Sequence, residues 1–300
     1  MAKAQEELGK MFQTFSSGFD DARLDKFIAD SDRIMRRPAG LLLAQAGFNT
    51  STSQPFQLLD HACGTGPIAA HLQDIVDGQV LSRSKMVCSD TSGSLIDALK
   101  RRSQKHKWVN VETAILDAQK SGLPDQSFSH VTLNFAMHII PDPGAVLQDA
   151  MRVLKPGGTL AFTVWHKGGA GWVPDMQSSF STLPFEAPMP GALLIAPNGK
   201  TEFIDPELIP EQLRAHGFED VQVRTAEHMM RVDSAADYLD SFGMIKDWMM
   251  RTYWSEESKE KASAMLDEHI VRHLTEKHGG QGWDLKWTLV LATCRKPGNC

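Results

Sequence analysis

Cysteine, long apolar runs and excess basic charge are all scarce in this sequence, and each shortage excludes a class of protein. The four cysteines, at positions 63, 88, 294 and 300, are not spaced as zinc ligands or as a thioredoxin motif, which is typical of a reduced intracellular protein. No window approaches the roughly 18 consecutive apolar residues that a membrane span needs. The charged segment Met1–Lys10 also lacks the apolar core of a secretory signal. We therefore expect a cytoplasmic protein without a membrane partner.

The chain also lacks the basic excess of a nucleic-acid-binding protein. Its formal net charge is −6, whereas phosphate contacts require a basic face. The one basic run, over residues 100–107, is expected to be the solvated face of a helix. The contents of 42% hydrophobic and 23% charged residues are typical of a soluble enzyme and argue against disorder. A chain of 300 residues suits one α/β domain with insertions.

Strand and helix patterns alternate through the first half of the chain, which predicts βαβ units and a doubly wound, mostly parallel sheet. Apolar helical stripes are expected over residues 67–76, 94–105 and 145–154. Counting two strands near the C-terminus, the pattern predicts a seven-stranded sheet, with strands over residues 56–60, 85–90, 111–117, 129–135, 159–165, 218–225 and 287–294.

The segment Leu58–Gly66 is the most informative motif: an apolar strand runs into an acid and then into a glycine turn, and Pro67 opens a helix. Such a turn lets the backbone approach a ligand, and the helix directs its N–H groups at the ligand's negative end. The third glycine of a dinucleotide motif is missing. Asp60, Asp90 and Asp117 end three consecutive strands, at the edge where open α/β sheets bind ligands.

These motifs resemble those of the class I S-adenosylmethionine-dependent methyltransferases. The resemblance covers residues 56–165 and implies a Rossmann-like fold. The segments that carry it are Leu59–Gly66, Cys88–Asp90, Leu116–Ala118, Phe128–Phe135 and Arg152–Gly158. Within the class, the chain is similar to fungal natural-product methyltransferases of the gliotoxin thiomethyltransferase type, through Asp60–Gly66, Lys100–Arg102, Trp108–Asn110, Gly122–Asp125 and Met11–Thr14.

The resemblance implies a role for each residue at the strand ends. The turn Ala62–Gly66 would lie against the methionine part of the cofactor, while Asp90 would hold the ribose. The family usually has glycine at position 62, so alanine is expected to fit only with a negative φ. Asp117 and its neighbour would face the adenine, and the residues leaving the fourth strand would lie near the sulfonium methyl. The implied cofactor residues are Asp60, Ala62, Gly64, Gly66, Asp90, Thr91, Asp117, Ala118, Asn134 and Phe135.

The same patterns divide the chain into segments. Residues 168–210 are rich in proline and glycine, which indicates an irregular insertion. Two helices are expected beyond position 226, the second between Ser255 and Gly279. The predicted order is an N-terminal helical cap (1–50), a cofactor-binding core (51–166), a substrate-side insertion (167–210), a core helix and strand (211–225), a helical lid (226–283) and a final core strand with a tail (284–300).

Methyl transfer from a sulfonium is an in-line displacement, so the protein mainly aligns the nucleophile about 3–3.5 Å from the methyl carbon. A base is needed only for a protonated nucleophile of high pKa. His138 and His166 follow the fourth and fifth strands and are the candidate bases, although each could instead cap a loop. His61 is expected to pack under the glycine turn.

Methionine- and aromatic-rich segments are expected to form the acceptor pocket, because such surfaces adapt to apolar ligands; ordinary helix packing is the alternative. A lid that includes Met11 is predicted to close over the site. The pair His269 and His273 could bind a metal, but a solvated helix face is favoured, and no metal is expected. The candidate pocket residues are Phe12, Phe15, Trp172, Met244 and Trp248.

The predicted function is transfer of a methyl group from S-adenosylmethionine to a S, O or N nucleophile of a small, largely apolar molecule, a fungal secondary metabolite, with S-adenosylhomocysteine as product. A carboxyl or hydroxyl methyltransferase of primary metabolism is one alternative. Another is a cofactor-binding scaffold that no longer transfers methyl, acting in regulation or in a rearrangement. The expected partner is a small-molecule substrate and not nucleic acid, and the protein is expected to be a monomer or a homodimer.

Overall fold

The computed structural model describes residues 7–11, 19–169, 171–189 and 196–298. Its centre is a seven-stranded sheet in the order β3-β2-β1-β4-β5-β7-β6, in which β7 is antiparallel to both of its neighbours and the other pairs are parallel. The predicted fold class is therefore confirmed. The strands are β1 (Gln57–His61), β2 (Lys85–Asp90), β3 (Val111–Ile115), β4 (Phe128–Asn134), β5 (Leu154–Trp165), β6 (Glu219–Val232) and β7 (Trp283–Arg295).

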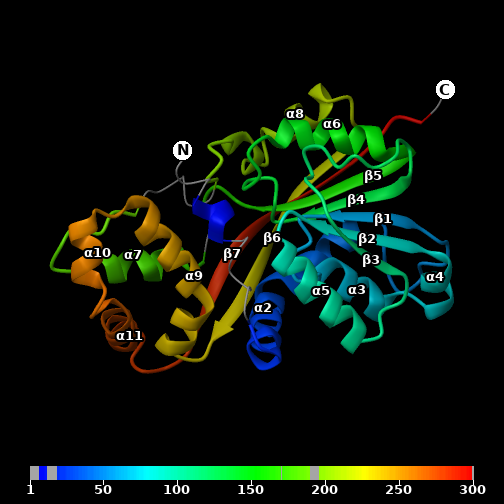
Figure 1. Cartoon of the computed structure of the whole chain (residues 1–300). Coiled ribbons are helices and arrows are strands. Elements are labelled where there is room, and N and C mark those ends of the chain that lie inside the picture. Colours follow the sequence, from blue (N-terminus) through cyan, green and yellow to red (C-terminus); the bar gives the residue numbers. More distant parts are fainter. Residues whose placement is uncertain (1–6, 12–18, 170, 190–195, 299–300) are drawn as a thin grey trace.

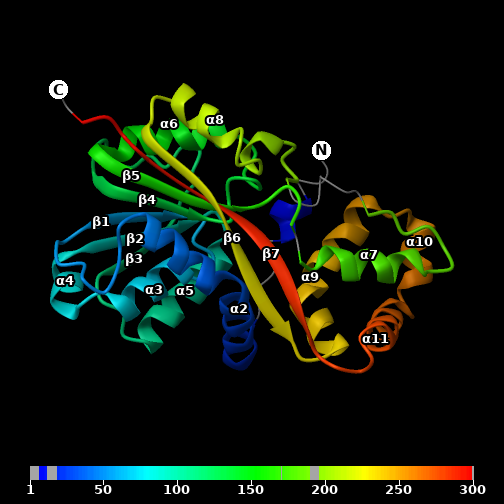
Figure 2. The ribbon, with the colours of Figure 1, turned by 180° about the vertical axis from the view of Figure 1, so that it is seen from behind.

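Helices cover both faces of the sheet (Figures 1 and 2). On one face lie α2 (Asp21–Gln45), α3 (Pro67–Ile75) and α5 (Gly93–Lys105), and on the other α6 (Pro143–Val153) and α8 (Ile209–Ala215). The short helices α4 (Gly78–Arg83) and η2 (Thr201–Phe203) complete this part. Successive residues of β1 point to opposite faces, so Leu58 joins one hydrophobic cluster and Leu59 the other, and both are fully buried.

A long ribbon formed by β6 and β7 extends beyond the sheet and carries a helical cap (Figure 1). The cap consists of α7 (Val173–Ser181), α9 (Ala235–Tyr253), α10 (Glu256–Ala262) and α11 (Leu266–Lys277). The prediction that helix begins at 226 is wrong, because β6 pairs with β7 as far as Val232. His228, Met230 and Val232 are buried and alternate with exposed residues, which is a strand pattern.

The cap contains more helices than the sequence patterns predicted. The segment expected to be irregular contains α7, which begins at a proline and buries Met176 and Phe180 one helical turn apart. The last predicted helix is in fact two, because the chain turns at residues 263–265 between α10 and α11. Among the described residues, no helix combines the length and apolar composition needed to cross a membrane.

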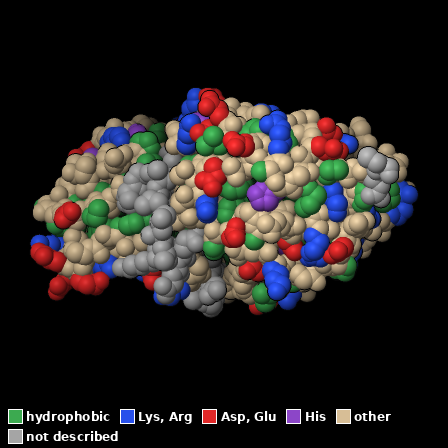
Figure 3. Space-filling model, turned by 90° about the horizontal axis from the view of Figure 1, so that it is seen from above, with side chains coloured by type: hydrophobic (Ala, Val, Ile, Leu, Met, Phe, Trp, Pro, Cys, Tyr) green, Lys and Arg blue, Asp and Glu red, His purple; other side chains and the backbone are tan. Residues whose placement is uncertain are grey.

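The helix α2 ties the core to the cap through ion pairs. Arg33 donates to Asp237 of α9 at 2.8 Å, and Arg102 of α5 donates to Asp32. Arg102 is only 6% exposed, so the prediction of a solvated basic face is wrong at this position. The described surface seen in Figure 3 mixes acidic and basic side chains and shows no broad patch of one sign.

Candidate active site

The three acids predicted to bind the cofactor lie at or just beyond the ends of neighbouring strands. In the sheet register Asp60 pairs with Cys88 of β2 on one side and Thr132 of β4 on the other. Asp90 is the last residue of β2, and its carbonyl accepts a hydrogen bond from the N–H of Leu116, the residue before Asp117. The predicted convergence at one edge of the sheet is therefore present.

The glycine turn after β1 has an unusual backbone. Gly66 has a φ of 81°, and a Cβ atom there would lie 2.4 Å from a methyl carbon of Leu99, so only glycine fits without a shift. Gly64 has a φ of 53°. The negative φ expected of Ala62 is wrong: its φ is 50°. A left-handed conformation costs about 1–2 kcal/mol for a residue with a Cβ, and such strain concentrates at functional sites.

Asp90 links the ends of β1 and β2. One of its carboxylate oxygens accepts from the N–H of Gly64 at 3.1 Å and the other from the N–H of Ser92 at 2.9 Å. Burial raises the pKa of Asp90 above its usual value, and these backbone donors oppose that effect. Each oxygen keeps further acceptor capacity for a ligand hydroxyl. The neighbouring Thr91 is exposed.

Asp60 has a carboxylate oxygen that no described residue satisfies. Oδ1 accepts from the Thr132 hydroxyl at 2.8 Å, but Oδ2 is buried and has no partner. Burial raises the pKa of Asp60 to about 7, and the nearby charge of Asp90 adds to this effect. A buried carboxylate oxygen without a donor needs an explanation. A positively charged ligand such as S-adenosylmethionine provides one, so the residues present fit the implied cofactor.

The affinity for S-adenosylmethionine should therefore depend on pH. The carboxyl of Asp60 is protonated below about pH 7, and only its charged form attracts a cation. We expect affinity to increase about fivefold between pH 6 and pH 7, because the charged fraction of a carboxyl with this pKa increases from about 9% to about 50% over that range. The pKa of Asp60 is 3.8 in the unfolded chain and about 7 in the fold, so the folded protein holds this proton more tightly. The free energy of unfolding of the ligand-free protein should therefore decrease as pH increases from about 3.8 to about 7.

Calorimetric titration of wild type, Asp60→Asn and Asp97→Asn at several pH values measures this dependence. Asp97 is an exposed carboxyl on α5 and is the matched control. Asp60→Asn should bind weakly with a flat pH profile, whereas Asp97→Asn should follow the wild type. An unchanged profile in Asp60→Asn would show that another group titrates.

The predicted adenine side is a loop after β3. Asp117 is exposed, and its carboxylate accepts from the backbone N–H of Gln119 at 2.9 Å and from the side-chain amide of Gln119 at 3.0 Å. Ala118 is buried. Asp117 therefore orders its own turn, and one face of the loop stays accessible beside the end of β2.

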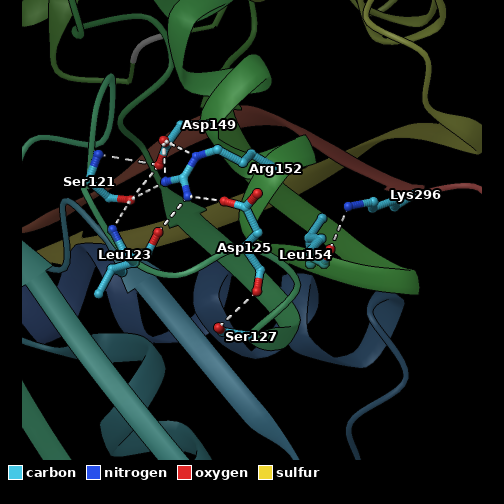
Figure 4. A network of polar contacts seen from close by, with 8 residues as sticks. All are labelled: Ser121, Leu123, Asp125, Ser127, Asp149, Arg152, Leu154 and Lys296. Atoms are coloured by element: carbon cyan, nitrogen blue, oxygen red, sulfur yellow. Dashed lines mark hydrogen bonds and ion pairs between the residues drawn. The ribbon is translucent and has the colours of Figure 1, made fainter.

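Arg152 holds this loop in place (Figure 4). Its guanidinium donates to the carbonyl of Leu123 at 2.5 Å, to Asp125 at 2.6 Å and to Asp149 at 2.7 Å. Asp149 in turn accepts from the Ser121 hydroxyl at 2.5 Å. The segment Arg152–Gly158 carries part of the family resemblance, but the sequence alone predicted no role for the Arg152 side chain. Its planar group suits several acceptors at once.

Asn134 is the last residue of β4, and Phe135 follows it. The side-chain oxygen of Asn134 accepts from the Thr163 hydroxyl at 2.7 Å. Phe135 has a φ of 60°, which is rare for an aromatic residue. Its ring stacks on Trp165 with centroids 4.2 Å apart. Strained backbone therefore occurs at the ends of two adjacent strands, at Ala62 and at Phe135.

The two candidate bases differ in their surroundings. His138 is 2% exposed, its buried Nδ1 has no hydrogen-bond partner in the part of the chain that the structure describes, and burial lowers its pKa to about 3. Its ring is therefore neutral at physiological pH and binds a proton weakly. His166 accepts from the N–H of Gly168 at 3.0 Å, so it caps its own loop. His61 packs under the turn as predicted, with Nδ1 2.6 Å from the Ser89 hydroxyl.

The candidate pocket residues that the structure describes lie in the cap and its junction with the sheet. Trp172 and Trp248 are buried in the hydrophobic cluster that also contains Phe135, and Met244 packs against it. Met11, at the end of a helical stretch over residues 7–11, is buried in the same cluster. Phe12 and Phe15 lie outside the described residues. One continuous apolar region thus joins the end of β4 to the cap.

The histidines of α11 connect it to α7. His269 Nε2 lies 3.0 Å from both the Ser179 carbonyl and the Thr182 hydroxyl, and His273 Nε2 lies 3.1 Å from the Ser178 hydroxyl. The expected solvated face is therefore wrong for His269, which is buried. Among the described residues, no group of three or more His, Cys, Asp or Glu side chains is placed to hold a metal ion.

Sequence reasoning missed the contact between α2 and the cofactor turn. Arg102 donates to the carbonyl of Thr65 at 2.9 Å, and the hydroxyls of Ser31 and Thr65 lie 2.9 Å apart. A signal for it was present, because Leu95, Leu99 and Arg102 fall on one helical stripe and all are buried.

The chain is similar to known methyltransferases. Residues 59–162 match the family model described as a methyltransferase domain. The chain is 28% identical over 260 residues to methyltransferase tpcH of Aspergillus fumigatus, covering 86% of this chain and 91% of that protein. The chain is an S-adenosylmethionine-dependent methyltransferase. The methyltransferase is also 26% identical to the acetylaranotin bis-thiomethyltransferase of Aspergillus terreus, covering 98% of this chain and 99% of that protein.

Solved structures share the fold of the methyltransferase. Phosphoethanolamine N-methyltransferase 2 of Haemonchus contortus, solved with S-adenosyl-L-methionine, superposes with a TM-score of 0.54 at 16% identity, covering 95% of this chain and 60% of that one. The [4+2]-cyclase SpnF superposes with a TM-score of 0.51 at 19% identity, covering 88% and 81%. At 16% and 19% sequence identity, these superpositions show a shared fold and not a shared substrate or reaction. The fold thus accommodates more than one reaction, and substrate chemistry has to be argued from side chains.

Proposed function

We propose that this methyltransferase moves the methyl group of S-adenosylmethionine to a S, O or N nucleophile of a small, largely apolar molecule, a fungal secondary metabolite. The observation that carries the proposal is the continuous apolar cluster that joins Phe135, beside the cofactor turn, to Trp172 and Trp248 of the cap. A polar or highly charged acceptor would be poorly solvated in such surroundings. The bis-thiomethyltransferase relative from Aspergillus terreus supports a sulfur acceptor.

In this proposal the acids at the strand ends bind and orient the cofactor. Asp90 accepts from the ribose hydroxyls, the free Oδ2 of Asp60 attracts the positive charge of the methionine part, and the loop of Asp117 and Ala118 borders the adenine. The cofactor, when bound, supplies a methyl group on a positively charged sulfur. The product is S-adenosylhomocysteine.

The cap and α2 then exclude water and align the acceptor, and alignment can account for about 7–11 kcal/mol of the barrier. Because burial lowers the pKa of His138 to about 3, this side chain would act as a neutral hydrogen-bonding group and not as a strong base. This favours acceptors that ionise readily, such as thiols and phenols. His166 would reach the acceptor only by giving up its bond to Gly168.

A transfer assay tests the proposal. The protein is incubated with S-adenosylmethionine labelled in its methyl group and with naphthalene derivatives that carry a thiol, hydroxyl, amine or carboxyl group. We expect label in the thiol or phenol product, with Asp90→Ala as the inactive control. Label only in the acid would support a carboxyl methyltransferase instead. Cofactor binding without any labelled product would support a scaffold. Cytoplasmic location, the absence of nucleic-acid and membrane partners, the absence of a metal and a monomeric or homodimeric state stay predictions.

A further inference from the structure

Two consecutive residues of α2 hold the threonine of the cofactor turn. The hydroxyls of Ser31 and Thr65 lie 2.9 Å apart. Asp32 accepts from Arg102 at 3.1 Å, and Arg102 donates to the carbonyl of Thr65 at 2.9 Å. Thr65 is 3% exposed and belongs to the turn Ala62–Gly66. The side chain of Thr65 is therefore held by α2 directly, and its carbonyl is held by α2 through Arg102.

The next residue of α2 binds the cap. Arg33 donates to both carboxylate oxygens of Asp237, at 2.8 Å and 2.9 Å, and to the carbonyl of Arg231 at 2.7 Å. Asp237 lies in the first turn of α9, and Arg231 lies near the end of β6. A bidentate contact between arginine and carboxylate fixes the orientation of the two groups as well as their distance. Arg33 therefore sets the position of α9 relative to α2.

The helix α9 connects this ion pair to the candidate acceptor pocket. Tyr238, next to Asp237, is fully buried, and its hydroxyl donates to the carbonyl of Trp172 at 2.5 Å. Further along α9, Trp248 is buried in the same hydrophobic cluster as Phe135. In Figures 1 and 2, α2 stands between α9 and the helices α3 and α5, which follow β1 and β2. A displacement of α2 would therefore reach both the cofactor turn and the acceptor side.

The contacts at both ends are close enough to act as one unit. Ser31, Asp32 and Arg33 span about 3 Å of the axis of α2, since each residue of an α-helix adds about 1.5 Å. The cofactor turn is strained, with a φ of 50° at Ala62, so it keeps its shape only while its surroundings hold it. Contacts from α2 favour the shape that binds the cofactor, and a bound cofactor must favour those contacts by the same factor.

We infer that Arg33 is a positioning residue that couples the cofactor turn to the cap, so that bound S-adenosylmethionine fixes α9 for the acceptor. This inference rests on the part of the proposed function that places the cofactor against the turn, and it extends that function to the control of acceptor binding. Without the cofactor, α9 separates from α2 more often and the acceptor side is less ordered. Acceptor binding is therefore favoured once the cofactor is in place.

Hydrogen exchange of the full chain, followed by mass spectrometry with and without saturating S-adenosylhomocysteine, tests the inference. In wild type this ligand should slow exchange of the α9 amides by about fivefold or more, which is the lower range of coupling between two sites. In Arg33→Met, where the connection is broken, it should change this exchange by less than about twofold. Slower exchange in α3, next to the turn, should persist in both proteins.

The same coupling should appear in the affinity for S-adenosylhomocysteine. Calorimetric titration should give a dissociation constant about fivefold or more higher in Arg33→Met than in wild type, although Arg33 is not proposed to touch the cofactor. Asp237→Asn should raise the constant as well. The double variant should bind no more weakly than Arg33→Met, because the two side chains act through one ion pair.

Arg36→Met is the matched control. Arg36 lies on the same helix and has a similar side-chain exposure, 26% against 32% for Arg33. In the described part of the chain it binds Asp74 and the carbonyl of Ala70 on α3 and Asp32 of its own helix, and not the cap. This variant should keep the ligand-dependent slowing in α9. Arg33→Lys, which keeps the charge without the bidentate contact, should retain part of the coupling and serves if Arg33→Met does not fold.

Equal slowing of α9 exchange in wild type and Arg33→Met would overturn the inference. So would the absence of slowing in wild type, or its loss in Arg36→Met. Failure of the proposed function has a different signature, because it would appear as the absence of labelled product from wild type with every acceptor, whatever the exchange of α9.

Discussion

Asp90→Ala is expected to weaken the binding of S-adenosylmethionine by about 100-fold or more. Asp90 is proposed to accept from two ribose hydroxyls, and a hydrogen bond to a charged group is worth about 1.5–3 kcal/mol, while about 1.4 kcal/mol corresponds to tenfold in affinity. The same carboxylate also accepts from the N–H groups of Gly64 and Ser92. Its removal therefore disturbs the turn as well as the ribose contact.

Calorimetric titration measures this effect, with Asp97→Ala as the control. Asp97 lies on α5, and its side chain is 71% exposed, so its loss should change affinity by less than about twofold. Circular dichroism of both variants would establish that they fold. If Asp90→Ala bound the cofactor within about threefold of wild type, the proposed ribose contact would be refuted.

Arg102→Ala is expected to lower the free energy of unfolding by about 3 kcal/mol. The guanidinium is 6% exposed and bonds Asp32 of α2 and the carbonyl of Thr65 in the cofactor turn. Removing one partner of a buried ion pair costs about 3–5 kcal/mol because the other group is left buried and unpaired. The side chain of Asp32 is 24% exposed, so the expected loss of stability lies near the lower end of this range.

The neighbouring Arg101→Ala is the matched control. Arg101 is 41% exposed and pairs with Asp21, which is 92% exposed, so its loss should cost less than about 1 kcal/mol. Urea unfolding followed by tryptophan fluorescence gives both values. Equal losses in the two variants would contradict the view that Arg102 fastens α2 to the turn. Because Arg102 also bonds the carbonyl of Thr65 in the cofactor turn, Arg102→Ala should weaken cofactor binding, whereas Arg101→Ala should not.

Local patterns were sufficient to predict the centre of this fold. The strand expected over residues 85–90 is β2, because a buried apolar run ends there in an acid that starts the next turn. Helix α5 begins within a residue of its predicted start, where Ser92 caps the helix by accepting from the N–H of Leu95. The positions of Asp60 and Asp90 at adjacent strand ends followed from the strand order alone.

Features that depend on distant partners could not be predicted in this way. The burial of Arg102 requires Asp32, which lies in another helix. The extension of β6 to Val232 depends on pairing with β7, and the adjacent Met229 and Met230 hide its alternation of buried and exposed residues. The positive φ of Ala62 reflects a turn held from outside by Asp90 through Gly64.

A crystal structure of the protein with S-adenosylhomocysteine tests the central claim most directly. We predict that the ribose hydroxyls donate to Asp90, that the amino end lies beside Asp60 and the turn Ala62–Gly66, and that the sulfur faces Phe135. A ligand bound away from the ends of β1 and β2, with the Oδ2 of Asp60 still unpaired, would contradict the account.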